Sequence, residues 1–220
     1  MKKINFLINK IIAHRGVHNS KVIENTLPAF LKCVDKNYVA ELDIHILRDN
    51  SIVVYHDYNL YRLTGVNKVI ETFSYPQLSK IKIKNKYTIP TLKQVIHIIN
   101  KKIPLLIEIK DANNNYRFEE ELVKILDNYD GEFAIQSVNM HVIDWFYKNR
   151  KNYLIGLVVL NKLNYGLAKK YIKKTDFLSV NKKLLPIKSK KIIIGWTIKN
   201  KKEYFKSDKL CDNLICENIL

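Results

Sequence analysis

Short apolar runs alternate with longer amphipathic stretches along most of the chain, and the rhythm is clearest after residue 90. The apolar runs have the length and the branched side chains of buried strands. They cover residues 11–13, 41–46, 105–110, 133–137, 154–159, 177–180, 192–196 and 213–216. The stretches between them repeat apolar residues every three or four positions, which predicts helices at residues 26–37, 91–101, 117–129, 140–150, 165–173 and 200–209.

Strands that alternate with helices favour a parallel sheet covered on both sides. Eight such strands in 220 residues match a closed TIM (β/α)8 barrel, so we expect one α/β domain over residues 1–220. The weakest repeat lies between the sixth and seventh strands, where residues 182–190 contain Pro186 and allow only a shortened helix. The alternative is an open doubly wound sheet, which usually carries a glycine-rich phosphate loop that this sequence lacks.

One segment departs from the rhythm. An additional strand is expected at residues 52–56, after a turn-forming polar cluster. Residues 58–87 are mixed in composition and predict loop-like structure with a single helical turn at residues 74–81.

The predicted strand at residues 41–46 alternates polar and apolar side chains. Glu41, Asp43 and His45 share one face, and aliphatic residues occupy the other. If the acidic face turns into a barrel, the two carboxylates repel each other unless a cation lies between them. A polar, solvent-facing edge of an antiparallel strand would show the same pattern, so the segment alone leaves both interpretations open.

Polar side chains interrupt the apolar strands near their carboxyl ends, where a barrel gathers its active site. They are His14, Arg15, Glu41, Asp43, His56, Glu108, Lys110, Gln136 and Trp196. The carboxylates of Glu41, Asp43 and Glu108 supply the oxygens that a hard cation prefers, which predicts one divalent cofactor, Mg²⁺ or Ca²⁺. The alternative for Glu108 is a simple ion pair with Lys110. Gln136 and Trp196 are expected to line the substrate pocket.

His14 and His56 each follow an apolar strand and precede a polar turn. An imidazole there can exchange a proton near neutral pH, although a packed histidine would show the same pattern. Arg15 and Lys110 provide positive charge for phosphate oxygens. Together these side chains fit phosphodiester cleavage, in which one histidine takes a proton from the nucleophile and the other protonates the leaving oxygen.

The remaining histidines carry weaker signals. His18 lies in the loop after the first strand, at the expected entrance of the site. His45 shares a face with the two acids and could support them without itself binding an ion. His97 and His141 fall in predicted helices and are expected at the surface.

The formal net charge of +17 raises the question of a nucleic-acid partner. Only 5 of the 38 basic residues are arginines, however, and the lysines are spread along the chain. We therefore expect a small-molecule substrate, no nucleic acid, and at most a transient contact with an anionic membrane. The three cysteines have no metal-site spacing, and no signal peptide or transmembrane segment is evident, which predicts a cytoplasmic protein.

Several short motifs resemble those of the glycerophosphodiester phosphodiesterases, and they follow that family's order from residue 11 to near the end of the chain. They are His14-Arg15-Gly16, Glu24-Asn25-Thr26 with Ala29-Phe30, Glu41-Leu42-Asp43-Ile44, Val53-Val54-Tyr55-His56-Asp57 with Leu60 and Arg62, Ile89-Pro90-Thr91-Leu92, Ile107-Glu108-Ile109-Lys110, Gln136-Ser137 and Trp196-Thr197. Separate motifs at matching separations make the resemblance specific.

The resemblance implies a TIM barrel that hydrolyses glycerophosphodiesters to glycerol 3-phosphate and an alcohol. It implies that His14 and His56 are the acid/base pair. It also implies that Glu41, Asp43 and Glu108 bind a divalent metal, and that Arg15 and Lys110 bind the phosphate. The family's route, in which the substrate's own glycerol hydroxyl attacks and forms a cyclic phosphate, suits two histidines.

Three departures from the family's motifs lie near strand ends. Leu47-Arg48-Asp49-Asn50 stands where Thr-Lys-Asp-Gly is usual, Lys199 takes the Asn position of Trp-Thr-Val-Asn, and Cys216-Glu217-Asn218-Ile219 replaces Thr-Asp-x-Pro. The last two put the alcohol side of the substrate in question. Two other functions stay open: a phospholipase D-like barrel acting on lysophospholipids, and a catalytically silent protein that binds phosphoesters.

Overall fold

The computed structural model describes residues 4–110 and 115–217, so Asn218 and Ile219 of the last departure lie outside the described residues. Within these ranges, eight parallel strands form a ring: β1 (Ile12–Ala13), β2 (Val39–Ile46), β6 (Leu105–Ile109), β7 (Phe133–Ser137), β8 (Leu154–Val159), β9 (Phe177–Asn181), β10 (Ile192–Ile198) and β11 (Asn213–Cys216). β1 pairs with both β2 and β11, which closes the sheet. The TIM barrel is therefore confirmed, and the open sheet is excluded.

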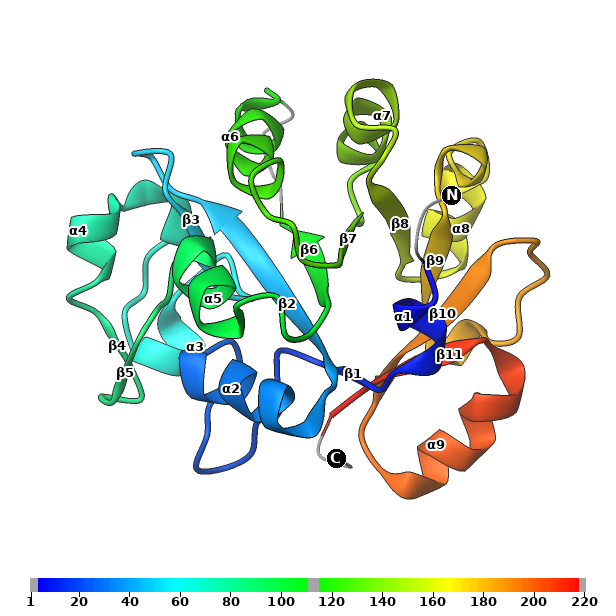
Figure 1. Ribbon diagram of the computed structural model, residues 1–220, viewed down its shortest axis with the longest axis horizontal. Helices are drawn as coiled ribbons and strands as arrows, with labels where there is room; N and C mark the ends of the chain where they lie inside the picture. Colours follow the sequence, from blue (N-terminus) through cyan, green and yellow to red (C-terminus); the bar gives the residue numbers. More distant parts are fainter. Residues whose placement is uncertain (1–3, 111–114, 218–220) are drawn as a thin grey trace.

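The helices lie around the outside of the ring (Figure 1). They are α2 (Leu27–Lys36), α5 (Leu92–Ile99), α6 (Arg117–Leu126), α7 (Met140–Asn149), α8 (Lys162–Ala168) and α9 (Lys201–Ser207), with 3₁₀ turns at Ile172–Lys174 and Asp208–Leu210. Between β9 and β10 the chain makes only the 3₁₀ turn Lys182–Leu184, which confirms the shortened connection. None of the helices in the described part of the chain is both long and apolar enough to cross a bilayer.

Side-chain caps explain where two of the helices begin. Thr91 and Gln94 form a capping box before α5, with each side chain accepting a hydrogen bond from the other's backbone N–H, at 3.1 and 2.9 Å. Asn161 accepts a bond from the backbone N–H of Asn164 at 2.8 Å, so α8 begins at Lys162. The single helix expected over residues 165–173 was therefore wrong, because the cap starts the helix earlier than its apolar spacing indicated.

The amino end of the ring is filled by α1 (Phe6–Asn9), a short helix that the sequence pattern did not predict. Phe6 and Leu7 are buried, and they pack with the interior residues Val39, Leu106 and Phe177. A helix of four residues is too brief to show a period. The ring is thus sealed with apolar side chains at the end opposite to the one where polar residues gather.

Between residues 47 and 91 the chain leaves the ring and builds a small unit of its own. β3 (Ile52–Val54) pairs antiparallel with β2, and α3 (Tyr61–Thr64), a 3₁₀ turn (Ile70–Thr72), α4 (Tyr75–Leu78), β4 (Lys82–Ile83) and β5 (Tyr87–Thr88) follow. A separate core of buried side chains, including Leu47, Tyr55, Leu60 and Leu78, holds these elements together. The loop-like segment expected here was wrong apart from the single helical turn, because elements this short escape periodicity.

We expect Leu7→Ala to lower the free energy of unfolding by about 2–5 kcal/mol, because it removes a fully buried side chain from the sealed end of the ring. Ile8→Ala is the control: Ile8 is 37% exposed, and its truncation should cost less than about 1 kcal/mol. Urea unfolding followed by circular dichroism measures both. Equal losses in the two variants would contradict a sealing role for α1.

Candidate active site

A cavity of about 140 Å³ lies at the carboxyl ends of the barrel strands. Its wall contains all the polar residues that the sequence pattern predicted for the site, namely His14, Arg15, Glu41, Asp43, His56, Glu108, Lys110, Gln136 and Trp196. Val158, Leu160, Thr197 and Ile215 complete it. Parallel strands end at one edge of a sheet, so residues far apart in sequence meet here.

Strand register places the acidic side chains next to one another. Asp43 of β2 is the pairing partner of Glu108 of β6, and Glu41 lies two residues before Asp43 on the same face. One carboxylate oxygen from each of the three residues lies within 4.8 Å of the others. Glu41 and Asp43 are each only 1% exposed, so water screens their charges little.

The carboxylates differ in electrostatic environment. Burial raises the pKa of Glu41 well above its usual range, and the charges of Asp43 and Glu108 raise it further. Burial also acts to raise the pKa of Asp43, but the cations of Lys110 and Arg15 outweigh it and lower that pKa. Of these two acids, Glu41 is therefore the one that the protein's own cations compensate less. A divalent cation would relieve this strain, and the all-oxygen donor set fits Mg²⁺ or Ca²⁺.

Two basic side chains lie against the acidic cluster. Nζ of Lys110 is 3.0 Å from Oδ1 of Asp43 and also pairs with Glu108. Arg15 donates its backbone N–H to Oε2 of Glu41 at 2.8 Å, and its Nε lies 3.3 Å from Oδ2 of Asp43. Burial would lower the pKa of Lys110, but Asp43 and Glu108 outweigh it and raise the pKa, so Lys110 stays charged.

The turn after β1 fixes the position of Arg15. Arg15 and Gly16 have positive φ angles of 55° and 79°. A Cβ atom at Gly16 would lie 2.9 Å from Cβ of Ala29, so glycine allows α2 to pack this closely. Asn25 donates its backbone N–H to the carbonyl of Arg15 and its side-chain amide to Oδ2 of Asp43, both at 2.9 Å. These motif residues form the frame that aims Arg15 at the acids.

Each pocket histidine has a carboxylate at Nδ1. Nδ1 of His14 lies 2.9 Å from Oε2 of Glu217, and Nδ1 of His56 lies 2.6 Å from Oδ1 of Asp57. The hydrogen bond with His14 lowers the pKa of Glu217 to about 2, so Glu217 is anionic. Burial lowers the pKa of His56 in spite of nearby carboxylates. With Nδ1 engaged, Nε2 is the nitrogen of each ring that remains for proton exchange.

A chain of ion pairs connects Arg15 with His56. Glu24 accepts hydrogen bonds from Nη1 of Arg15 at 2.8 Å and from Nη2 of Arg62 at 2.7 Å. Nε of Arg62 in turn donates to Oδ2 of Asp57 at 2.6 Å, and Asp57 holds His56. The loops after β1 and β3 are therefore bound to each other beside the cavity.

Two further wall residues offer hydrogen-bonding groups. Nε2 of Gln136 donates to Oε2 of Glu108 at 3.4 Å, and Oε1 of Gln136 accepts from the hydroxyl of Ser179 at 2.5 Å, which fixes the amide. Nε1 of Trp196 is buried and has no hydrogen-bond partner among the described residues, so it can donate to an oxygen of a bound molecule.

The other candidate histidines lie outside the cavity wall. His45 is fully buried, with Nε2 at 3.3 Å from the carbonyl oxygen of His56 and Nδ1 at 3.4 Å from Oε1 of Glu71. It thus supports the backbone of His56. His18 groups with His14 and Glu217, and burial lowers its pKa.

The sequence pattern missed the charged partners Glu24, Asp57, Arg62 and Glu217. The first three stand inside the motifs quoted above, which was the available signal, but the motifs do not show that these side chains bind one another. Glu217 counted only as a departure from a motif. It meets His14 because β1 pairs with β11, so that Ala13 lies beside Cys216.

Comparisons with known proteins identify the family of the chain. Residues 14–156 match the model of the glycerophosphoryl diester phosphodiesterase family. A glycerophosphodiester phosphodiesterase of Caldanaerobacter subterraneus is 32% identical over 160 residues, which cover 67% of this chain and 65% of that protein. Human lysophospholipase D GDPD1 is 34% identical over 169 residues, which cover 69% of this chain and about half of the human protein, 52%.

A solved structure shares the fold. The Oleispira antarctica phosphodiesterase, in complex with the product sn-glycerol-3-phosphate, superposes with a TM-score of 0.82 at 18% identity and covers 96% of this chain and 93% of that one. A barrel with acids, imidazoles and basic groups in one mouth fits a phosphoric diester hydrolase, the class of protein that the family match indicates. The chain belongs to the glycerophosphoryl diester phosphodiesterase family.

We expect Glu24→Gln to lower the free energy of unfolding at neutral pH by about 1–3 kcal/mol, because two arginines lose the carboxylate that they share. Burial acts to raise the pKa of Glu24, but Arg62 and Arg15 outweigh it and lower the pKa from 4.5. The stabilising charge is therefore fully present above about pH 4.5 and is lost as the pH falls through the lowered value. The difference in free energy of unfolding between wild type and Glu24→Gln should therefore become smaller at acidic pH.

Urea unfolding at neutral and acidic pH measures this difference. Glu121→Gln is the matched control, because Glu121 pairs with Lys124, whose side chain is 67% exposed. This substitution should lower the free energy of unfolding by less than about 1 kcal/mol. A loss in Glu24→Gln that does not change between the two pH values would contradict the charge-based explanation.

Proposed function

We propose that the protein hydrolyses glycerophosphodiesters to glycerol 3-phosphate and an alcohol, with His14 and His56 as the acid/base pair. The observation that carries the proposal is the pairing in one cavity of two imidazoles, each held at Nδ1 by a carboxylate, with three acids and two basic side chains. Membership of the phosphodiesterase family supports it. The Oleispira antarctica phosphodiesterase, whose structure is a complex with the product sn-glycerol-3-phosphate, supports the choice of substrate class.

The two histidines divide the proton transfers. Nε2 of one ring accepts the proton of the attacking glycerol hydroxyl, and Nε2 of the other donates a proton to the oxygen of the leaving alcohol, which gives a cyclic phosphate. Water then opens the cyclic phosphate to glycerol 3-phosphate, with the roles of the two rings exchanged. Glu217 and Asp57 hold the rings and stabilise the positive charge that each imidazole carries when it is protonated. A catalytically silent phosphoester-binding protein would have no need of two imidazoles supported in this way.

Charge on the phosphate is met by the basic residues. Arg15 and Lys110 lie in the cavity wall and remain cationic beside the acids, so they can bind phosphoryl oxygens. The N–H of Trp196 offers one further donor. Glu41, Asp43 and Glu108 would hold a Mg²⁺ or Ca²⁺ ion, which when bound would add positive charge next to the developing negative charge on the phosphate.

A second candidate is the removal of the headgroup alcohol from lysophospholipids. Leu160 lines the cavity and is 42% exposed, and Leu163, three residues further along the chain in α8, is 75% exposed. Exposed apolar side chains that continue from the cavity wall would suit an acyl chain. The name of the human relative, lysophospholipase D, favours the same substrates. Release of glycerol 3-phosphate from glycerophosphocholine, compared with release of choline from lysophosphatidylcholine, separates the two candidates.

We expect His14→Ala and His56→Ala each to lower kcat for glycerol 3-phosphate release by about 10²–10⁴-fold, the usual contribution of an acid/base group. His97→Ala is the control, because His97 is an exposed residue of α5 outside the cavity. Circular dichroism establishes that each variant is folded. Unchanged turnover in either cavity variant would remove that histidine from the mechanism.

We expect chelation to abolish activity, and Mg²⁺ or Ca²⁺ to restore it and to raise the Tm. Because burial raises the pKa of Glu41, its effect on stability is most favourable in acid and is lost as the pH rises toward the raised value. Glu41→Gln should therefore raise the Tm of the cation-free protein at neutral pH and abolish the rise caused by the ion. Scanning calorimetry with and without chelator measures both. A variant that still gains stability from the ion would exclude Glu41 as a ligand.

A further inference from the structure

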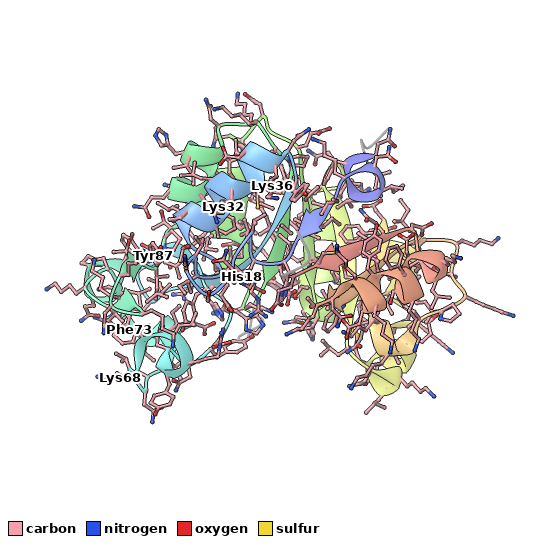
Figure 2. The ribbon with its side chains drawn as sticks, turned by 90° about the horizontal axis from the view of Figure 1, so that it is seen from below. His18, Lys32, Lys36, Lys68, Phe73 and Tyr87 are labelled. Atoms are coloured by element: carbon pink, nitrogen blue, oxygen red, sulfur yellow. The ribbon has the colours of Figure 1, made fainter. Side chains whose placement is uncertain are left out.

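A second cluster of metal-ligating side chains lies beside the acidic one. His14 follows β1, Glu217 follows β11, and these strands are neighbours in the ring, with Ala13 next to Cys216. The two side chains therefore emerge side by side. His18, labelled in Figure 2, lies four residues beyond His14 in the loop that leads to α2. One ligand atom from each of His14, His18 and Glu217 lies within 4.8 Å of the others.

The hydrogen bonding of this cluster is incomplete. Oε2 of Glu217 is 2.9 Å from Nδ1 of His14. Nε2 of His18 is buried and has no hydrogen-bond partner within the described ranges. A buried polar atom without a partner costs free energy, and a metal ion is one of the groups that can satisfy it. An imidazole is mostly neutral above about pH 7, so its lone pair is then available to an ion.

The donor set selects a different ion from the acidic cluster. Two imidazoles and one carboxylate are a characteristic ligand set for zinc, whereas carboxylates alone suit Mg²⁺ and Ca²⁺. Because zinc holds such ligands at about 2.0–2.2 Å, the ligand atoms around one ion lie roughly 3.3 Å apart. The cluster would close around an ion with side-chain movements of about 1 Å. We propose that His14, His18 and Glu217 form a Zn²⁺ site that is separate from the acidic cluster.

Positive charge near the cluster opposes a cation, but it does not block the ligand atoms. Nζ of Lys199 lies 3.6 Å from Oε1 of Glu217, the oxygen that does not contact His14. The side chain of Lys199 is 59% exposed and can turn into solvent. The guanidinium of Arg15 is engaged by Glu24 and Asp43. Glu217 can therefore bind zinc through Oε2 while Oε1 keeps its contact with Lys199.

Zinc at this site would inhibit the hydrolysis, and this consequence rests on the proposed function. An imidazole that binds zinc through one nitrogen has its other nitrogen protonated, so it cannot accept a proton. His14 would leave the acid/base pair for as long as the ion stays bound. The protein would then use a hard cation at Glu41, Asp43 and Glu108, and a borderline cation beside it would switch the reaction off.

The test measures zinc binding to the whole chain by calorimetry, with excess Mg²⁺ to occupy the acidic cluster. We expect one Zn²⁺ ion to bind, and His18→Gln to weaken binding at least about tenfold, since even the loss of a group that only orients a metal ligand costs 10–100-fold. His97→Gln is the matched control and should bind zinc like wild type. Equal affinity in wild type and His18→Gln would overturn the proposal, and so would loss of zinc binding in Glu108→Gln alone.

Two further measurements keep the proposal testable if a variant does not fold, or if the proposed function is wrong. Co²⁺ added to the unmodified chain in place of Zn²⁺ should give the strong visible absorption of a four-coordinate site with nitrogen ligands; the weak spectrum of an all-oxygen octahedral site would count against the cluster. The zinc concentration for half inhibition, relative to each variant's own zinc-free rate, should rise at least about tenfold in His18→Gln. Zinc that binds through His18 without slowing hydrolysis would leave the site intact and remove His14 from the mechanism.

Discussion

Repulsion among three neighbouring carboxylates is the constraint on which the rest of the site depends. The register of β2 and β6 forces Glu41, Asp43 and Glu108 onto one interior face, and burial of Glu41 and Asp43 prevents water from screening their charges. Lys110 and Arg15 neutralise part of that negative charge, and the ion pairs hold both side chains in place. The positive φ at Arg15 and the close packing of Gly16 against α2 place the positive charge of Arg15 beside the acids.

Much of this could be predicted from the sequence, because a strand has a period of two. Alternation alone placed Glu41 with Asp43 and gave Glu108 an inward face, and apolar runs located the eight strands of the ring. The contact between His14 and Glu217 could not be predicted in this way, since 203 residues separate them and only closure of the ring brings them together. Short elements such as α1 were missed because four residues make about one helical turn, which is too few for a repeat of apolar positions to show.

Two departures from the family's motifs turn out to be one feature of the structure. Lys199, at the end of β10, and Glu217, at the end of β11, carry opposite charges, and their side chains lie 3.6 Å apart. Residues that looked like independent losses in the sequence thus compensate each other in space. They also change the surroundings of His14, because the carboxylate that contacts Lys199 through one oxygen contacts the imidazole through the other.

The position of His56 has a consequence for how the protein would lose activity on unfolding. His14 stands at the end of a ring strand, whereas His56 is carried by the small unit that leaves the ring between residues 47 and 91 and has its own core. Local unfolding of that unit would move the imidazole of His56 out of the site while the eight strands of the ring stayed paired. Under the proposed mechanism, warming or mild denaturant should therefore end activity while most of the secondary structure persists. The lifetime of the active protein would then be set by its least stable part rather than by the barrel.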